Sequence, residues 1–296
     1  MRALVTGGAG FIGSHLVDAL VARGDEVVVL DDLSTGRRDY VNPAAQFRPH
    51  DVREPFEIGA DLVFHLAAQA DVGTSMERPS FDAEVNVVGT VNALEAARAA
   101  GAHLVFSSTG GAIYGSVEAP AREDSALLPV SAYGLAKRSA EVYLDGWNRI
   151  FGTHHVALRF ANVYGPRQSA ALEGGVIAIF LERLAAREPT TIFGDGTITR
   201  DFVHVDDVVR ALLLAGGRRG GVFNVGTGTE TSVSELHRLC EQAVGVDAPA
   251  VHGPPRAGDA HRSVLDTSRA AAELGFTAEV ALGPGIAETH AAIEKE

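Results

Sequence analysis

Two side chains able to move a proton lie four residues apart in the segment Tyr133-Gly-Leu-Ala-Lys137. In a helix this spacing places both on one face, one turn from each other. A lysine ammonium beside a phenol favours the phenolate, so we expect the pKa of Tyr133 to fall from about 10 toward neutrality. A tyrosine with that pKa can exchange a proton with a substrate hydroxyl. Such a pair also occurs by chance, as a surface lysine beside a core tyrosine, so the context decides between the two interpretations.

The context of this pair is an apolar strand-like segment that ends in Ser107-Ser108-Thr109, followed by a helix expected over residues 132–150. The hydroxyl cluster would therefore lie at the end of a strand, upstream of the tyrosine. The apolar positions of the helix recur at helical spacing, so we expect them to be buried. They are Ala136, Ala140, Tyr143, Trp147 and Phe151.

The start of the chain carries the segment Thr6-Gly-Gly-Ala-Gly-Phe-Ile-Gly13 between a predicted strand at 2–6 and a predicted helix at 12–23. Gly7 and Gly10 permit backbone conformations and a close approach that side chains would block, and Gly13 lets the helix pack against the strand. The N–H groups at the helix N-terminus can bind a pyrophosphate. The segment predicts a dinucleotide-binding turn; the alternative is a structural βα turn without ligand.

The next apolar run, residues 26–30, is typical of a buried parallel strand and ends on Asp31 and Asp32. A carboxylate at this position accepts hydrogen bonds from the adenosine ribose and repels a 2′-phosphate. This favours NAD over NADP. Arg37 and Arg38 could instead favour NADP, but we interpret them as solvated loop charges.

Strand-like and helix-like segments alternate through about residue 165, which predicts an α/β fold: a Rossmann-type doubly wound parallel sheet with a smaller C-terminal α/β substrate-binding domain. We assign residues 1–165 to the NAD-binding domain, to which 198–225 returns, and residues 166–197 and 226–296 to the other domain. Strands are predicted at 2–6, 26–30, 46–50, 61–66, 103–108, 155–160, 191–193 and 223–225, and helices at 12–23, 82–100, 132–150, 176–184, 205–215 and 232–243.

Composition excludes several classes of protein. The 296 residues, 46% of them hydrophobic, can bury a full core. The net charge of −13 disfavours nucleic acid and anionic membranes as partners. Cys240 is the single cysteine, and no leader or membrane-length apolar run is present, so we expect a cytoplasmic protein without disulfides. None of the 11 histidines is spaced for a zinc site, so we expect no metal.

Taken together, the motifs resemble those of the extended short-chain dehydrogenase/reductase family, most closely its nucleotide-sugar epimerases of the UDP-glucose 4-epimerase type. The resemblance covers nearly the whole chain, and it is more specific for the family than for the individual sugar. Besides the glycine turn and the Tyr133 motif, it is carried by Asp31-Asp-Leu-Ser-Thr-Gly36, His65-Leu-Ala-Ala-Gln69, Asn86-Val-Val-Gly-Thr90, Phe106-Ser-Ser-Thr109, Arg159-Phe-Ala-Asn-Val-Tyr-Gly-Pro-Arg167, Arg200-Asp-Phe-Val-His-Val-Asp-Asp207 and Asn224-Val-Gly226.

The resemblance implies a tightly bound NAD that is regenerated in each catalytic cycle. The three glycines of the turn would bind the pyrophosphate, Asp31 the adenosine ribose, and Asp51 with Val52 the adenine. Ala67 and Ala68 would lie under the cofactor, and Lys137 would bind the nicotinamide ribose. The full set implied for the cofactor is Gly7, Gly10, Phe11, Ile12, Gly13, Asp31, Asp32, Ser34, Gly36, Asp51, Val52, Leu66, Ala67, Ala68, Tyr133 and Lys137.

The resemblance also implies 4-epimerisation of a UDP-hexose through a 4-keto intermediate, with Tyr133 as proton acceptor and donor. A UDP-glucuronate or dTDP-sugar 4-epimerase, a nucleotide-4-ketosugar reductase and an NAD-binding sensor without turnover are the alternatives. A homodimer is expected, joined by a four-helix bundle from the helices around 86–100 and 132–150. The substrate-binding residues implied are Thr109, Asn162, Val176, Arg200, Arg256 and Asp259.

The chain departs from the family pattern after Thr109, where Gly110-Gly111 makes the segment before Tyr114 apparently one residue longer than usual. Either Thr109 or Ser108 could therefore face the sugar O4, and the glycine pair could form a β-bulge. Related 4,6-dehydratases and decarboxylases carry an acid just after the Ser/Thr, which this chain lacks, so an epimerase is favoured. Ser263, small where the family can have a bulky gatekeeper, suggests tolerance for 2-acetamido sugars.

Overall fold

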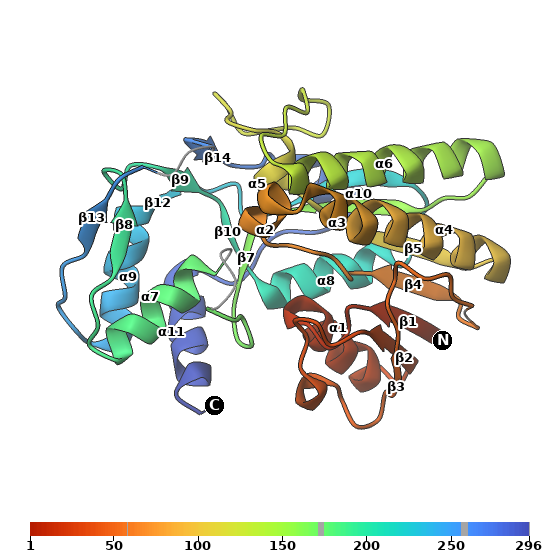
Figure 1. Ribbon diagram of the computed structural model, residues 1–296, viewed down its shortest axis with the longest axis horizontal. Helices are drawn as coiled ribbons and strands as arrows, with labels where there is room; N and C mark the ends of the chain where they lie inside the picture. The colour runs from red at the N-terminus through yellow and green to blue at the C-terminus, as the bar shows by residue number, and fades with distance from the viewer. Residues whose placement is uncertain (58, 171–174, 256–259, 296) are drawn as a thin grey trace.

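The computed structural model describes residues 1–57, 59–170, 175–255 and 260–295. Its centre is a seven-stranded parallel sheet of order β3-β2-β1-β4-β5-β6-β11 (Figure 1). This arrangement confirms the predicted Rossmann-type α/β fold. The strands are β1 (Arg2–Thr6), β2 (Glu26–Asp31), β3 (Gln46–Pro49), β4 (Leu62–His65), β5 (His103–Thr109), β6 (Val156–Phe160) and β11 (Gly221–Val225).

Helices cover both faces of this sheet because its strands are apolar on both sides. In β2, Val27 and Val29 join the core under α1 (Phe11–Ala22), α8 (Val205–Ala215) and α10 (Ser268–Leu274). The alternate residues Val28 and Leu30 join the second core, under α4 (Gly89–Ala100) and α6 (Ala132–Phe151). The period-two alternation of a strand thus supplies two separate cores.

The strand order reverses direction between β1 and β4, and this point places the ligand-binding edge of the sheet. In doubly wound sheets, ligands bind outside the carboxyl ends of the strands at such a switch point. The glycine turn follows β1, the loop 66–71 follows β4, and the hydroxyl cluster ends β5. All three segments predicted to do chemistry therefore lie at the same edge.

A smaller group of elements lies at one end of the sheet and has its own core (Figure 1). Its helices, α7 (Val176–Ala185), α9 (Val233–Val244) and α11 (Leu282–Ile293), pack on one another. The strands are short and fall into three small sheets, so periodicity alone could not reveal most of them. They are β7 (Asn162–Tyr164) with β10 (Phe202–His204), β8 (Thr191–Phe193) with β13 (Val251–Gly253), and β12 (Thr231–Ser232), β9 (Thr199–Arg200) and β14 (Arg262–Ser263) in one sheet.

Two helix predictions need correction. The single helix expected at 82–100 is three segments, α3 (Pro79–Ala83), a π-helix η2 (Glu84–Val88) and α4. In α6 the buried side runs through Ala136, Ala140 and Leu144, whereas Tyr143 and Phe151 are each 45% exposed. The apolar residues of α6 cover more of its circumference than the sheet can bury. Three shorter helices complete the described chain: η1 (Arg38–Tyr40), α2 (Val72–Glu77) and α5 (Gly110–Ile113).

None of the helices in the described ranges combines the length and the apolar character needed to cross a lipid bilayer.

Candidate active site

The glycine turn after β1 is shaped by contacts that exclude side chains. Gly7 has a φ of +70°, and a Cβ on it would lie 2.6 Å from the backbone nitrogen of Ala67. A Cβ on Gly13 would collide with the carbonyl oxygen of Gly7. The turn itself therefore requires glycine at this position, in addition to the packing of the helix on the strand. Helix α1 starts at Phe11 and Ile12, and its N-cap, Gly10, has no side chain to cap the first N–H groups. The turn therefore fits a pyrophosphate.

Asp31 ends β2 beside this turn. Its Oδ2 accepts a hydrogen bond of 2.9 Å from Ala9 N, and its Oδ1 accepts one of 2.9 Å from Leu33 N. Burial raises the pKa of Asp31, against these two backbone hydrogen bonds. A Cβ on Gly36 would lie 2.9 Å from Asp31 Oδ1, so a side chain at this position would press on the carboxylate, which is 7% exposed. The neighbouring Asp32 is exposed and accepts hydrogen bonds from the N and Oγ of Ser34.

The adenine and nicotinamide ends of the predicted cofactor site come from other loops. Asp51 pairs with Arg53 at 2.5 Å, and this contact lowers the pKa of Asp51, while Val52 is buried. Leu66 and Ala67 donate to the backbone oxygen and the side-chain oxygen of Thr6, at 3.1 and 3.2 Å. These bonds hold the loop from Leu66 through Ala68 against the glycine turn, so the residues present can accommodate a dinucleotide.

Tyr133 and Lys137 both lie at the N-terminal end of α6, which Ser131 caps by accepting a hydrogen bond of 3.2 Å from Gly134 N. Lys137 is 2% exposed, and its Nζ donates to the backbone oxygen of Ser107 at 3.0 Å. That contact joins α6 to the end of β5. Nζ lies 5.9 Å from the centroid of the Tyr133 ring, so the predicted pair shares one face of the helix.

The expected shift of the tyrosine is wrong for the protein without ligands. Burial and, after it, the charge of Asp82 raise the pKa of Tyr133 to about 12, against the opposing effect of the Thr109 hydroxyl. Burial lowers the pKa of Lys137 to about 8, while the charges of Asp82 and Glu141 raise it. A low-dielectric site disfavours both charged forms, and the spacing of two residues in sequence does not reveal that.

Thr109 and Ser108 point to opposite faces of β5. The side chain of Thr109 reaches Tyr133 and also accepts a hydrogen bond of 3.2 Å from Ala112 N. Ser108 Oγ donates to Glu141 Oε1 at 2.5 Å and is 3% exposed. Of the two hydroxyls left open by the sequence, only Thr109 contacts the tyrosine.

The glycine pair after Thr109 forms no bulge. Residues Gly110–Ile113 are a single helical turn, α5, with Thr109 as its N-cap. A Cβ on Gly110 would lie 2.6 Å from Leu265 Cδ1, so this glycine is required by packing. A Cβ on Gly111 would lie 3.3 Å from Asn162 Oδ1 and 3.9 Å from Thr109 Oγ1, so this glycine faces the site.

A network of buried polar side chains joins α6, β6 and β11 next to the site, and the sequence analysis did not predict it. Arg159 Nη2 pairs with Glu141 Oε2 at 2.6 Å, and Arg159 Nη1 donates to Tyr114 Oη at 2.7 Å. Tyr114 in turn donates to Asn224 Oδ1 at 2.8 Å. Both charges of the ion pair are nearly inaccessible. A lone arginine in the apolar strand 156–160 was the available signal, because a buried charge requires a partner.

The residues predicted to bind substrate are only partly brought together. Asn162 lies near Thr109 across Gly111, and Arg200 is held by hydrogen bonds from its Nη1 to the backbone oxygens of Thr199 and Ala260, at 2.9 and 2.7 Å. Val176 is the first residue of α7 and is partly exposed. Arg256 and Asp259 lie outside the described residues.

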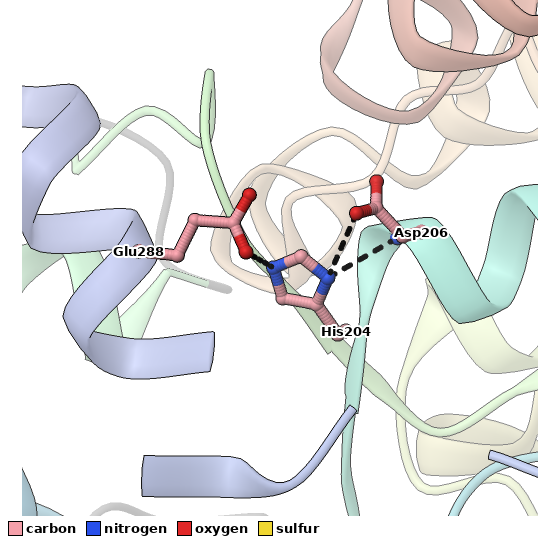
Figure 2. A group of neighbouring side chains, drawn as sticks. All are labelled: His204, Asp206 and Glu288. Carbon is pink, nitrogen blue, oxygen red and sulfur yellow. Dashed lines mark hydrogen bonds and ion pairs between the residues drawn. The ribbon is translucent and has the colours of Figure 1, made fainter. Parts of the chain in front are cut away.

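One further group of potential ligands stands out among the described residues: His204, Asp206 and Glu288 (Figure 2). His204 Nδ1 lies 3.4 Å from Asp206 N and 3.7 Å from Asp206 Oδ2, whereas Nε2 lies 4.0 Å from Glu288 Oε2. The two carboxylates flank the imidazole, and one ring nitrogen and one oxygen of each carboxylate lie within 4.8 Å of one another. We interpret the group as a link between β10, α8 and α11. That the protein binds no metal stays a prediction.

The sheet topology, the glycine turn and the tyrosine–lysine pair define a dinucleotide-binding protein of the oxidoreductase-like α/β class. Residues 3–226 match the NAD dependent epimerase/dehydratase family, and the chain belongs to that family. It is 49% identical over 305 residues to UDP-glucose 4-epimerase of Mycolicibacterium smegmatis, covering 98% of this chain and 97% of that protein.

Two solved structures are also similar over their full lengths. UDP-glucose 4-epimerase of Thermotoga maritima, solved with UDP-glucose, superposes with a TM-score of 0.96 at 43% identity, covering 100% of this chain and 99% of that one. UDP-glucose 4-epimerase of Thermus thermophilus, solved with NAD, gives 0.94 at 42% identity, with 99% of each chain covered. The cofactor predicted from Asp31 agrees with the family, which is NAD-dependent.

Proposed function

We propose that this protein is an NAD-dependent 4-epimerase that interconverts UDP-glucose and UDP-galactose. The observation that carries the proposal is the arrangement of Tyr133 and the buried Lys137 at the carboxyl end of β5, where Lys137 Nζ lies 5.9 Å from the Tyr133 ring centroid and donates to the backbone oxygen of Ser107. The similarity to UDP-glucose 4-epimerases along the whole chain supports both the nucleotide and the sugar.

The site residues supply the proton transfers of the reaction. Tyr133 accepts the proton of the sugar 4-hydroxyl when C4 is oxidised, and returns it when the 4-ketose is reduced on its other face. Thr109, whose hydroxyl acts on Tyr133 from the end of β5, is placed to hold O4 during both steps. A bound NAD⁺ would supply the acceptor and donor for the C4 hydride. Because the two half-reactions cancel, the protein needs no external oxidant or reductant.

The absence of an acid next to Thr109 favours this outcome over elimination or decarboxylation. Just after the Ser/Thr position, where related 4,6-dehydratases and nucleotide-sugar decarboxylases carry an acidic residue, this chain has only glycine and alanine. Gly110 is committed to packing against Leu265, and Gly111 leaves space between Thr109 and Asn162. A 4-ketose held here meets no general acid or base directly after Thr109, and so it is reduced again.

The C-terminal part of the chain is proposed to bind the nucleotide of the sugar substrate. We assign residues 1–165 and 198–225 to cofactor binding, and residues 166–197 and 226–296 to the UDP-sugar. In an acidic protein an anionic diphosphate needs focal cations, and a guanidinium can bind its oxygens in bidentate fashion. Arg200 and Arg256 are the proposed partners, and Arg200 is held in place by backbone oxygens.

Ser263 supports a wider sugar range. It lies in β14, paired in register with Arg200, and its side chain is 5% exposed. A small residue here leaves room for a 2-acetamido group, so we expect turnover of UDP-N-acetylglucosamine as well. Ser263→Tyr should abolish that activity while leaving UDP-glucose turnover within a few-fold of its original value. Loss of both activities, or of neither, would contradict this assignment.

We also propose a cytoplasmic homodimer, formed by the outer face of α6 together with η2 and α4. The outer face of α6 carries a hollow lined by Leu135, Arg138, Ser139, Val142 and Tyr143. Several large apolar side chains of this region are exposed, namely Val88, Leu135, Val142, Tyr143, Ile150 and Phe151. Contiguous exposed apolar surface of this kind is typical of an interface.

The test of the activity is incubation of the purified protein, without added cofactor, with UDP-glucose, UDP-N-acetylglucosamine, UDP-glucuronate and dTDP-glucose in separate reactions. Proton NMR would identify any product with inverted C4. We expect UDP-galactose from UDP-glucose, and a loss of roughly 10³-fold in kcat for Tyr133→Phe. Product from UDP-glucuronate or dTDP-glucose alone, or net reduction that depends on added NADPH or NADH, would contradict the proposal.

A further inference from the structure

Lys137 is buried in surroundings that disfavour its charge. It is 2% exposed, and its Nζ lies 4.9 Å from the centroid of the Phe106 ring. An ammonium group has three donors, and one of them is used by the backbone oxygen of Ser107. Burial lowers the pKa of Lys137 to about 8, against the charges of Asp82 and Glu141, so loss of a nearby negative charge would favour the neutral amine at working pH.

Asp82 offers such a countercharge. It lies in α3, which packs on α6, and it is 1% exposed. Its Oδ1 accepts hydrogen bonds of 2.9 Å from both Gln69 Nε2 and Asn86 Nδ2. Its Oδ2 is buried and has no hydrogen-bond partner among the described residues. A buried carboxylate oxygen without a donor is costly, and its charge is screened little by solvent.

The negative charge of Asp82 acts on both members of the catalytic pair. It raises the pKa of Lys137 and, after burial, is the next largest cause that raises the pKa of Tyr133. Glu141 is the other carboxylate acting on Lys137, but it is already paired with Arg159 at 2.6 Å. Asp82 is therefore the carboxylate near Lys137 without a cationic partner of its own in the described part of the chain.

Asp82 also connects to the loop after β4. Gln69, whose amide donates to Asp82, donates in addition to the backbone oxygen of Asp71, and Asn86 Nδ2 donates to the backbone oxygen of Gln69. This loop begins at Leu66 and Ala67, which contact the glycine turn. The Asp82 carboxylate thus contacts the loop after β4 through Gln69, and its charge acts on Tyr133 and Lys137 of α6.

We propose that Asp82 is a positioning residue of the active site: a buried countercharge that keeps the Lys137 side chain as an ammonium ion and fixes the loop after β4 beside it. This goes beyond the proposed function, and only its effect on the reaction rate depends on that function. Among the titratable groups on the elements packed against α3 are Glu77 of α2 with Asp71 at its N-cap, Glu84 of η2, and Tyr133, Lys137 and Glu141 of α6.

The chain allows a direct measurement of the lysine. Of its 25 lysine and arginine residues, only Lys137 and Lys295 are lysines. Protein labelled with ¹³C-lysine therefore gives two side-chain signals, and Lys295 near the C-terminus serves as the internal reference. The midpoint of the Lys137 signal against pH reports its protonation whether or not any substrate is turned over.

Asp82→Asn removes the charge and keeps the acceptor at Oδ1. We expect the midpoint of the Lys137 titration to fall by about one pH unit relative to wild type, at equal NAD content. Asp82→Glu, which keeps the charge, should restore most of the shift. Asp71→Asn is the matched control, because it neutralises a neighbouring carboxylate that is not among the charges acting on Lys137, and its midpoint should equal that of wild type.

If Asp82→Asn leaves the midpoint unchanged, or if Asp71→Asn moves it equally, the countercharge role is wrong. Thermal denaturation checks that each variant folds, and Asp82→Ser provides a second neutral side chain if Asn is not tolerated. For kcat measured against pH, loss of the charge should move both the acid and the alkaline limb to lower pH. A uniform decrease with both limbs in place would indicate a structural role only. Failure of the protein to epimerise any sugar would remove the kinetic readout and leave the lysine titration intact.

Discussion

Ser107, Ser108 and Thr109 are consecutive hydroxyl residues with three different partners. Ser107 Oγ donates to the backbone oxygen of His65 at 3.0 Å, Ser108 Oγ donates to Glu141, and Thr109 Oγ1 accepts from Ala112 N and acts on the pKa of Tyr133. Side chains alternate along a strand, so Ser108 points from one face of β5 toward Glu141, while Ser107 and Thr109 point from the other face. The residues are chemically alike, and only their position in β5 separates a structural hydroxyl from one placed for catalysis.

This difference predicts opposite effects of two small substitutions. Thr109→Val keeps the shape and removes the hydroxyl beside Tyr133, so kcat should fall roughly 10²-fold with little change in stability. Ser108→Ala removes a buried hydrogen bond to a charged group, so the free energy of unfolding should fall by about 1.5 kcal/mol while kcat stays unchanged. Steady-state kinetics and urea unfolding of both variants provide the check. An inverted result would assign O4 to Ser108.

At the scale of elements, the two glycines of the single helical turn α5 have different roles. Gly110 packs against the core, and Gly111 faces the candidate site. Gly110→Ala would drive a methyl group into Leu265 in the core, which should cost about 1–3 kcal/mol of stability. Gly111→Ala would add a methyl group beside Asn162 and Thr109, so kcat/KM should fall while the melting temperature stays the same. Calorimetry and kinetics on the two variants separate these effects. Equal losses of stability would mean that the contact of Gly111 with Asn162 is as rigid as that of Gly110 with Leu265.

Strands β1 and β4 and helix α4 are tied together by one neutral histidine. His65 Nδ1 and Nε2 lie 2.8 and 3.2 Å from the hydroxyl oxygens of Thr6 and Thr90, and burial lowers the pKa of His65 from 6.5 to about 3. Between these two pH values the unfolded chain binds a proton that the folded chain does not. The contribution of His65 to stability is therefore present above pH 6.5 and is lost as the pH falls below it.

The expected result is that stability decreases on acidification by up to about 1.4 kcal/mol per pH unit from this group alone. His65→Gln should be less stable at neutral pH, but its stability should depend less on pH between 6.5 and 4. Urea unfolding at several pH values measures the slope, with His252→Gln, which replaces an exposed histidine of β13, as the control. Parallel slopes for wild type and His65→Gln would contradict the buried neutral state.

At the scale of the whole molecule, the apolar outer face of α6 corrects the expectation that Tyr143 and Phe151 are buried within one chain. Each is 45% exposed, and Val142 between the buried positions is 62% exposed. A helix that is apolar around more of its surface than one sheet can cover has a second apolar face left over. In the proposed dimer, a second copy of the chain would cover that face.

Val142→Glu would place a charge in the proposed interface, so the dimer should dissociate to monomers in sedimentation velocity at micromolar concentration. Val251→Glu is the matched control, because Val251 is a similarly exposed valine on β13, and its sedimentation should match that of wild type. A wild-type protein that is monomeric at these concentrations would rule out the dimer.

The sequence by itself determined the parts of the protein that depend on local spacing. The glycines of the turn, the apolar runs of β1 and β2, and the i, i+4 pair of Tyr133 and Lys137 each follow from neighbouring residues, because backbone geometry fixes what such spacings can form. The parallel order of the sheet followed from the alternation of strands and helices. These predictions were enough for the fold class and for the NAD-dependent family.

Only the tertiary structure decided how those residues behave. The pKa of Tyr133 rises because residues distant in sequence bury it, with Asp82 as a negative charge beside it. The choice between Thr109 and Ser108 depends on the direction of side chains in β5, and Glu141 finds Arg159 across 18 positions. Desolvation and long-range charge are properties of the packed interior, so no local pattern contains them. The sequence therefore identified the side chains that could react, and the fold determines their pKa shifts and their hydrogen-bond and ion-pair partners.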